Sequence, residues 1–306
     1  GQLKGNQVIS IDPYIEELVN APSTNLKIVM DGRDLKFLDN TFNTTAIFYT
    51  LMYIDGADHE KVFNEVKRVL KHGGKLMIWD VNLPVSQDTS KYYGVFRFNF
   101  KLPKIEINTG YGARFPKKTD QNMQYYIDIA KKTGFRVKKA QSNHPSFYIE
   151  LQTPPAITDT LAEIIDKKGI DFALNNYNQL EDSKSNEYYF GVDALISLSS
   201  EYLLSDKAKE ATEIFKLAIN KFEIEENIIN SFGYKLLNKK KNKEALEIFK
   251  INVKKFPHSS NAYDSLAEAY MLDNQKEPAI RNYQKALELN PNHRNAEEMI
   301  KKLSIN

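Results

Sequence analysis

A period of 34 residues runs through the C-terminal half of the chain and limits what that half can fold into. Alanines, aromatic residues and other small residues recur at this step: Ala211, Ala245 and Ala279; Phe215, Phe249 and Tyr283; Ser199, Gly233 and Ala267. Pro257 and Pro291 keep the same spacing. Small residues where helices cross, and a proline closing each unit, predict stacked helix-turn-helix hairpins.

This pattern resembles the tetratricopeptide repeat, and the motifs DSLAEAY at 264–270 and ALELNPN at 286–292 strengthen the resemblance. It implies an all-α solenoid over residues 156–306, similar to the repeat tails found behind bacterial enzyme domains. We expect an incomplete repeat at about 157–180, a polar insert at 181–187, full repeats at 192–225, 226–259 and 260–293, and a capping helix at 296–303. Such repeats bind partners and carry no chemistry, so catalysis must lie upstream.

The first helix of each repeat is expected to line a concave, partner-binding face. The side chains predicted there are acids, amides and one tyrosine: Asp193, Asn227, Asn230, Tyr234, Asn261, Asp264 and Glu268. Repeats that clamp a peptide's terminal carboxylate use Lys and Arg, which this set lacks. A basic or polar peptide, or self-association, fits the set better. A rigid spacer without a dedicated ligand is the alternative.

Strands and helices alternate through residues 1–153. Apolar runs at 7–12, 27–30, 44–50 and 75–81 predict strands, and 13–20 and 58–71 predict helices, the second followed by Gly73-Gly74. This order favours a mostly parallel, doubly wound α/β sheet. A strand at 95–100, a helix at 122–133 and a final strand at 147–151 follow. Pro154-Pro155 marks the domain boundary, because the residue before a proline is held extended.

Three segments, in this order, resemble a class I S-adenosylmethionine-dependent methyltransferase: VISID at 8–12, MDGRDLKFLDNTF at 30–42 and KRVLKHGGKLMIWD at 67–80. The resemblance covers about half of the chain and implies a Rossmann-like domain, S-adenosylmethionine as cofactor and direct methyl transfer to an unidentified acceptor. The family's first strand and Gly-rich loop should precede residue 7. We therefore expect an incomplete domain and weak or absent cofactor binding by this chain. If the parent protein is longer and carries the loop, we expect it to be an active enzyme.

The resemblance places five residues at the cofactor: Asp12, Asp31, Gly32, Arg33 and Tyr49. Asp12, at the carboxyl end of a strand, would accept the ribose hydroxyls, and Asp31 the adenine amino group. Gly32 would let the backbone approach the ring, and Tyr49 would lie beneath the sulfonium. Structural alternatives are a helix cap for Asp12, a turn for Asp31 and core packing for Tyr49. No catalytic residue is assigned.

Other segments give weaker indications. The stretch 109–112 (TGYG) is either a lid over substrate or, as we favour, a plain turn. The basic residues at 131–139 fit a solvated helix end and an edge strand better than a nucleic-acid groove. The five histidines show no metal-ligand spacing, so no metal site is predicted.

Composition limits the remaining classes. The 306 residues include no cysteine, which excludes disulfides and thiolate chemistry and fits the cytoplasm. A net charge of +2 gives no argument for nucleic acid, and no apolar run approaches the roughly 18 residues of a membrane span. The sequence thus favours a methyltransferase with a protein-interaction tail. The alternative is a non-catalytic interaction scaffold that carries a truncated or degenerate methyltransferase fold.

Overall fold

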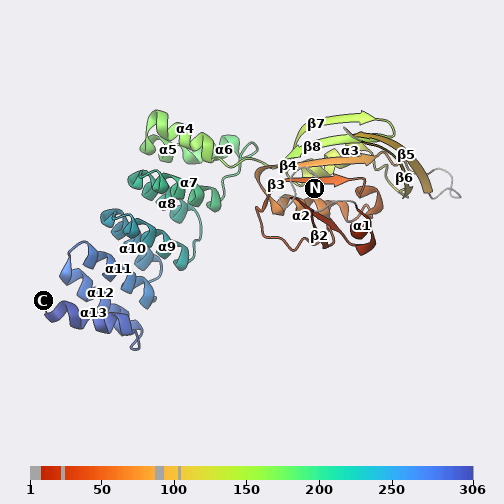
Figure 1. Ribbon diagram of the computed structural model, residues 1–306. Coiled ribbons are helices and arrows are strands. Elements are labelled where there is room, and N and C mark those ends of the chain that lie inside the picture. The colour runs from red at the N-terminus through yellow and green to blue at the C-terminus, as the bar shows by residue number, and fades with distance from the viewer. Residues whose placement is uncertain (1–7, 22–24, 87–92, 103–104, 306) are drawn as a thin grey trace. The chain divides into compact units, whose positions relative to one another are not determined.

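The computed structural model describes residues 8–21, 25–86, 93–102 and 105–305 (Figure 1). Its residue contacts divide the chain into two units. The first unit comprises residues 1–155 together with 186–189, and the second comprises 156–185 together with 190–306. Gln7, where the first expected strand begins, lies outside the described residues. Among the helices of the described residues, none combines the length and the apolar character that crossing a membrane requires.

Strands and helices alternate in the first unit, as the sequence predicts. The elements are β1 (Ile9–Asp12), α1 (Ile15–Asn20), β2 (Leu26–Val29), β3 (Phe42–Phe48), the 3-10 helix η2 (Leu51–Tyr53), α2 (His59–Val69), β4 (Leu70–Val81), β5 (Tyr93–Leu102), β6 (Ile105–Arg114), α3 (Met123–Lys132), β7 (Arg136–Asn143) and β8 (Ser146–Gln152). The side chain of Asn122 caps α3 by accepting a 3.0 Å hydrogen bond from the backbone N–H of Tyr125.

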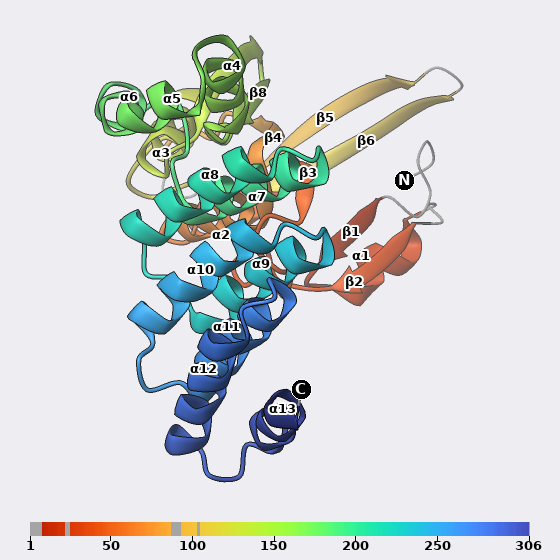
Figure 2. The same ribbon diagram turned by 90° about the vertical axis from the view of Figure 1, so that its left-hand side faces the viewer.

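The strands form three separate sheets. β1 and β2 pair in parallel; β3 and β4 also pair in parallel, within a four-stranded sheet of order β3-β4-β8-β7. β8 runs antiparallel to both β4 and β7, and β5 and β6 form a long antiparallel hairpin (Figure 2). The prediction of one continuous sheet is wrong. Among the described residues, β1 pairs with β2 alone and β3 pairs with β4 alone, so no backbone hydrogen bonds join the two parallel pairs into one sheet.

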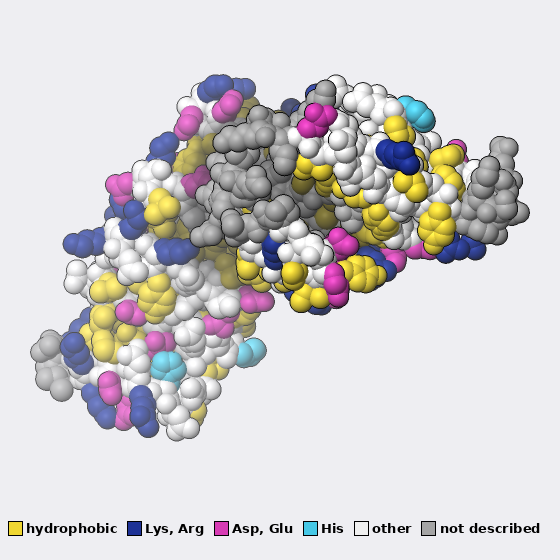
Figure 3. Space-filling view, turned by 45° about the vertical axis from the view of Figure 1, so that its right-hand side comes forward, with side chains coloured by type: hydrophobic (Ala, Val, Ile, Leu, Met, Phe, Trp, Pro, Cys, Tyr) yellow, Lys and Arg dark blue, Asp and Glu magenta, His cyan; other side chains and the backbone are white. Residues whose placement is uncertain are grey.

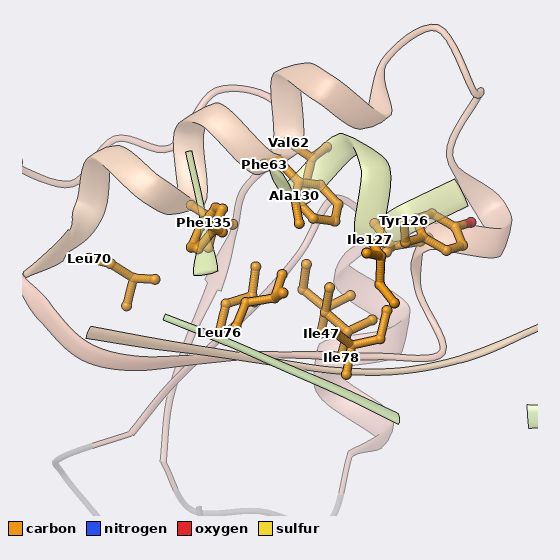
Figure 4. Packing of buried hydrophobic residues seen from close by; sticks show 14 of the residues in the cluster. Ile47, Val62, Phe63, Leu70, Leu76, Ile78, Tyr126, Ile127, Ala130 and Phe135 are labelled. Carbon is orange, nitrogen blue, oxygen red and sulfur yellow. The ribbon is translucent and has the colours of Figure 1, made fainter. Parts of the chain in front are cut away.

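The core of the first unit lies where α2 and α3 cover one face of the four-stranded sheet (Figure 4). Alternate residues of the central strands point into it and are fully buried, as Leu76 and Ile78 in β4 and Ile149 in β8 show. Phe63 of α2 and Tyr126 of α3 meet them from above. Successive side chains of a strand point to opposite faces of the sheet. This alternation decides which side chains enter the covered face and which lie at the sheet edge.

Two expectations about glycines are wrong. Gly73 and Gly74 lie inside β4, because α2 ends at Val69 and the chain extends at once. A Cβ on Gly74 would stand 2.7 Å from the carbonyl oxygen of Lys71, which explains the glycine. Residues 109–112, expected as a turn or a lid, belong to β6, where Gly110 pairs with Arg97. The ladder between β5 and β6 extends through them.

The second unit is entirely helical. Its helices are α4 (Thr158–Lys168), α5 (Ile170–Asn175), α6 (Tyr177–Lys184), α7 (Val192–Leu204), α8 (Ala208–Lys221), α9 (Glu226–Asn238), α10 (Asn242–Lys255), α11 (Ser260–Leu272), α12 (Lys276–Leu289) and α13 (Arg294–Ile305). α7, α9 and α11 begin 34 residues apart, as do α8, α10 and α12. The expected register of helical hairpins is therefore confirmed. The polar insert at 181–187 begins as the last turn of α6.

The periodic residues occupy the contacts between helices. Ala211, Ala245 and Ala279 have no exposed surface. Phe215 and Phe249 are likewise fully buried, and the ring of Phe215 stacks on Phe232 at 4.0 Å. The small and aromatic positions that repeat in the sequence are thus the positions at which neighbouring helices approach most closely.

Candidate functional site

Asp12 ends β1, and its side chain faces the start of α1. Its Oδ1 accepts a 2.8 Å hydrogen bond from the backbone N–H of Tyr14. Its carbonyl oxygen accepts a 3.0 Å bond from Met30 and so joins the ends of β1 and β2. This contact forms a turn just before the helix. It is not the helix cap offered as the alternative for Asp12, because α1 begins at Ile15 with Tyr14 at its N-cap position and has no side-chain capping bond. The ribose role stays a prediction, for which the half-buried position at a strand end is suitable.

Asp31, Gly32 and Arg33 form a turn in which the two charged side chains face each other. The guanidinium of Arg33 binds both carboxylate oxygens of Asp31 at 2.6–3.0 Å and also reaches Asp58 at 2.7 Å. Hydrogen bonds from Arg33 hold the pKa of Asp31 below its usual value. Asp31 therefore stays an acceptor, as a bond from an adenine amino group requires, but it shares its oxygens with Arg33.

Packing does not require a glycine at position 32, because a Cβ built there would meet only Val62, at 3.9 Å. Beside this turn lies an open hollow of about 490 Å³, lined by Arg33, Asp34, Ala57, Glu60, Lys61, Asn64 and Glu65. Its lining is mostly charged, whereas small-molecule sites are mostly apolar with few polar groups. The hollow therefore does not resemble a site for an apolar methyl acceptor.

Tyr49 follows β3 and is 6% exposed. Its φ of 48° lies in the left-handed region, which is rare for an aromatic residue. Its N–H donates a 2.7 Å bond to the carbonyl oxygen of Trp79, and its ring stacks on Tyr111 with centroids 5.1 Å apart. The core alternative for Tyr49 is thus observed. Tyr49 also has a strained backbone conformation at a strand end, and such backbone outliers are frequent at functional sites.

The hairpin β5–β6 supplies an aromatic surface that the sequence analysis missed. We define the aromatic wall as Phe48, Tyr49, Phe98, Phe100 and Tyr111. Within it Tyr49 lies 4.7 Å from Phe98, and Phe48 lies 5.5 Å from Phe100. Phe48 is 49% exposed, so the wall is open on that side. The alternation VFRFNF at 95–100 is the signal that could have revealed it.

Hydrophobic side chains also reach the surface of the first unit elsewhere, as the yellow atoms interspersed with charged ones show (Figure 3). They include Tyr93 and Val95 on the outer face of the hairpin, which are 69% and 72% exposed. The inner face is distinguished by aromatic rings that contact one another and the end of β3. Open aromatic surface beside a strand end is suited to an apolar ring.

Asp80, near the end of β4, is a fully buried carboxyl that the sequence analysis did not single out. Its Oδ2 accepts a 2.8 Å bond from the N–H of Leu51, and its Oδ1 accepts a 2.9 Å bond from Val81. Burial raises the pKa of Asp80 to about 7, against the opposing effect of these backbone donors. A carboxylate after the apolar run KLMIW at the end of a strand was the available signal.

His59, at the start of α2, is a second fully buried titratable group. Its Nε2 lies 3.0 Å from the carbonyl oxygen of Leu51 and its Nδ1 lies 3.1 Å from the hydroxyl of Tyr125. Burial lowers the pKa of His59, so the ring is neutral. Among the described residues, no three His, Asp or Glu side chains come close enough to hold a metal ion.

In the second unit, hydrogen bonds join several of the predicted groove residues. The Tyr234 hydroxyl donates to Glu268 at 2.8 Å. Asn295 donates to both oxygens of Asp264, at 2.9 and 3.0 Å. Asn261 donates to Glu226 at 3.0 Å. These bonds link α9 to α11 and α11 to α13, so part of the predicted face serves to hold the repeats together.

Asn227 borders a hollow of about 270 Å³ in the second unit. The lining of this hollow is largely apolar and consists of Ile196, Phe215, Asn227, Ile228, Ser231, Phe232 and Lys235. The buried Oδ1 of Asn230 has no hydrogen-bond partner within the described residues. Asp193 lies in the first turn of α7. The sequence argument that the groove lacks cations needs correcting at one point, because Lys235 borders this hollow.

Comparison with known proteins finds similarity within the first of the two units. Residues 2–78 match the family described as a methyltransferase domain. The ubiquinone/menaquinone biosynthesis C-methyltransferase of Idiomarina loihiensis is 36% identical over 75 residues, which cover 24% of this chain and 29% of that enzyme. The match therefore spans under a third of the length of this relative.

Solved structures align with part of the chain. A SAM-dependent methyltransferase from Methanosarcina mazei aligns with 48% of this chain and 81% of its own, at 15% identity and a TM-score of 0.33. The first TPR of Spaghetti (RPAP3), bound to an HSP90 peptide, aligns with 37% of this chain and 90% of its own, at 20% identity and a TM-score of 0.30.

Proposed function

We propose that the first unit is the S-adenosylmethionine-binding part of a methyltransferase and that the second unit is a tetratricopeptide repeat domain that binds a protein partner. The observation that carries the first half is the methyltransferase-domain match over residues 2–78, which includes Asp12, Asp31, Gly32, Arg33 and Tyr49. We infer a cytoplasmic location, which the absence of cysteine supports. A non-catalytic scaffold is the second candidate, favoured by the internal contacts of Asp12 and Asp31.

The cofactor role of Asp12 is tested by Asp12→Ala in a parent chain that carries the Gly-rich loop. Losing a carboxylate that accepts both ribose hydroxyls is expected to weaken S-adenosylmethionine binding about tenfold to hundredfold. Calorimetric titration measures this, with Asp128→Ala on the exposed side of α3 as the matched control. Unchanged affinity in Asp12→Ala would leave Asp12 with only its turn contact to Tyr14.

For the acceptor we propose an apolar aromatic ring that stacks on the aromatic wall. Two observations support this: the wall adjoins Tyr49, and the matched relative from Idiomarina loihiensis bears the name of a ubiquinone/menaquinone biosynthesis C-methyltransferase. The wall also lies beside Trp79, the single tryptophan, whose ring is 6.0 Å from Phe48.

The proposed acceptor surface predicts that 1,4-naphthoquinone quenches Trp79 fluorescence in a saturable way. Phe100→Ala removes one ring of the wall and should raise the dissociation constant about two- to tenfold, as one aromatic contact is worth ~0.5–1.5 kcal/mol. Tyr93→Ala, on the outer face of the same hairpin, is the control and should bind like the wild type. Equal affinity in both variants would remove the wall from the acceptor site.

For the repeats we propose a basic or polar peptide as partner. The predicted face offers Asp193, Asp264 and Glu268 as acids, and the hollow beside Asn227 could take an apolar side chain of the peptide. Neither nucleic acid nor membrane is part of this proposal.

Charge reversal of the peptide tests this proposal. A fluorescent Lys-rich peptide of about ten residues should bind by anisotropy, and Glu268→Lys should weaken it about tenfold through repulsion and loss of the bond to Tyr234. Glu277→Lys, in the first turn of α12, is the matched control with the same change of charge. The Asp- and Glu-rich counterpart of the peptide should not bind. If it binds equally well, the charge argument fails. If neither peptide binds, the spacer alternative stands.

A further inference from the structure

The backbone of Leu51 is held on both sides by buried side chains. Asp80 accepts a hydrogen bond from the Leu51 N–H at 2.8 Å, and the Nε2 of His59 lies 3.0 Å from the Leu51 carbonyl oxygen. A carbonyl oxygen only accepts, so Nε2 carries the hydrogen. All three residues have no exposed surface. A backbone segment between a strand and a helix is thus fixed by two side chains from elsewhere in the unit.

The two side chains are themselves held in place. The second carboxylate oxygen of Asp80 accepts a 2.9 Å bond from Val81. A neutral His59 with its hydrogen on Nε2 has an acceptor at Nδ1, which lies 3.1 Å from the hydroxyl of Tyr125. These bonds tie the end of β4, the start of α2 and helix α3 to one residue, Leu51.

The segment that they hold begins with Tyr49, the strained residue of the candidate site. A left-handed φ of 48° in an aromatic residue persists only where the surroundings determine it. Tyr49 lies two residues before Leu51, and its own N–H is bound to the carbonyl oxygen of Trp79, the residue before Asp80. The contacts of Leu51 therefore complete the set of bonds that orients the Tyr49 ring on the aromatic wall.

We propose that Asp80 and His59 are positioning residues, which hold Leu51 by its N–H and its C=O and so fix Tyr49 beside the proposed acceptor. The part of this inference that concerns an acceptor rests on the function proposed above. The hydrogen bonds and their effect on the segment 49–53 can be tested without cofactor or acceptor.

The hold on Leu51 depends on pH through Asp80. As a carboxylate it accepts bonds at both oxygens, and on protonation one oxygen becomes a donor, which weakens the bond from an N–H. The pKa of Asp80, raised by burial to about 7, puts this change near neutrality. The titratable groups near Asp80 are Tyr49, Tyr53 and Tyr126, whose pKa values are raised mainly by burial and in part by the charge of Asp80.

His59 does not take part in this titration. Asp55, Asp58, Tyr125 and Tyr126 are the titratable groups around it. Burial nevertheless lowers the pKa of His59, which favours its neutral ring. Within the described residues, Asp80 is thus the group that changes the hold on Leu51 near neutral pH.

The test uses Trp79 fluorescence against pH and hydrogen exchange at the Leu51 amide, both on the whole chain without ligands. The wild type should show a fluorescence transition near pH 7 that Asp80→Asn abolishes. Exchange at Leu51 should be at least ~10-fold faster in Asp80→Asn at about pH 8, because the amide loses its ionised acceptor. Asp128→Asn, an exposed carboxyl of α3, should leave both readouts unchanged.

His59 is tested by a conservative pair. His59→Gln retains a side-chain donor for the Leu51 carbonyl and should keep the pH curve, whereas His59→Leu should shift or flatten it. If Asp80→Asn does not fold, the ¹³C shift of the Asp80 carboxyl in the wild type still reports its titration. Ionisation of that carboxyl below about pH 5, or Leu51 exchange unaffected in Asp80→Asn, would overturn the proposal. Failure of the parent chain that carries the Gly-rich loop to bind cofactor would contradict the proposed function and leave this inference intact.

Discussion

The stability of the first unit is expected to fall by about 4 kcal/mol between about pH 4 and pH 8 through Asp80 alone. The folded pKa of Asp80 is raised from 3.8 to about 7, and each unit corresponds to ~1.4 kcal/mol. The folded state therefore binds this proton more tightly than the unfolded state does. The resulting stabilisation is complete below pH 3.8 and is lost as the pH rises through about 7.

Other groups change stability over part of the same range, so the effect must be isolated as a difference. Burial lowers the pKa of His59, and its contribution is present above pH 6.5 and lost as the pH falls below that value. Asp31 and Glu65 have lowered pKa values, so their contributions are lost only as the pH falls below their ordinary pKa values of 3.8 and 4.5. Subtracting the pH profile of stability of Asp80→Asn from that of the wild type cancels the contributions of His59, Asp31 and Glu65.

Urea unfolding followed at Trp79 measures this difference, because the single tryptophan belongs to the first unit. The free energy of unfolding of the wild type, minus that of Asp80→Asn, should decrease by about 4 kcal/mol over the range. Asp128→Asn provides the baseline for an exposed carboxyl. A difference that stays constant with pH would show that backbone donors outweigh burial at Asp80 and that its pKa is near the ordinary value.

The largest effect expected in the second unit is that of Phe249→Ala, which should destabilise the repeats by ~3–5 kcal/mol. The ring of Phe249 is fully buried and lies 5.3 Å from that of Tyr234 in an edge-to-face contact. It also occupies the space into which Gly233 would project a side chain. A Cβ built on Gly233 would stand 2.5 Å from the ζ carbon of Phe249.

This close approach predicts that the effect of Gly233→Ala on the free energy of unfolding depends on whether the Phe249 ring is present. In the wild type it should cost ~1–3 kcal/mol, because a buried ring cannot move aside. In the Phe249→Ala background it should be neutral or stabilising, since the methyl enters the vacated space and alanine favours a helix by ~1 kcal/mol over glycine. Denaturant unfolding followed by circular dichroism measures both.

The neighbouring repeats provide the control for this cycle. The equivalent positions hold Ser199 and Ala267, so a Cβ is accommodated where the helix spacing allows it. Ala267→Gly should therefore also destabilise the third full repeat, here because glycine is a poorer helix former than alanine. A cost for Gly233→Ala that is the same with and without the Phe249 ring would mean that the two residues do not share this space.

The sequence by itself determined the elements that depend on local periodicity. The 34-residue step predicted where α7, α9 and α11 begin, because each hairpin buries the same small and aromatic positions against the next. The strands β1, β3 and β4 and the helix α3 likewise follow from apolar runs and caps. The cofactor residues Asp12, Asp31, Gly32, Arg33 and Tyr49 stay predictions from the resemblance, supported by the family match over their segment.

Only the tertiary structure decided what depends on residues far apart in the chain. The sequence did not reveal that Arg33 occupies the carboxylate of Asp31 and reaches Asp58, since side-chain pairing leaves no periodic signal. Residues 109–112 became a strand because β5 offers a complete ladder of hydrogen bonds, which a local glycine pattern cannot indicate. The hold of Asp80 and His59 on Leu51 joins positions 29 and 8 residues apart, in an environment from which water is excluded. Burial gives these two ordinary side chains their shifted pKa values, and burial is a property of the folded chain.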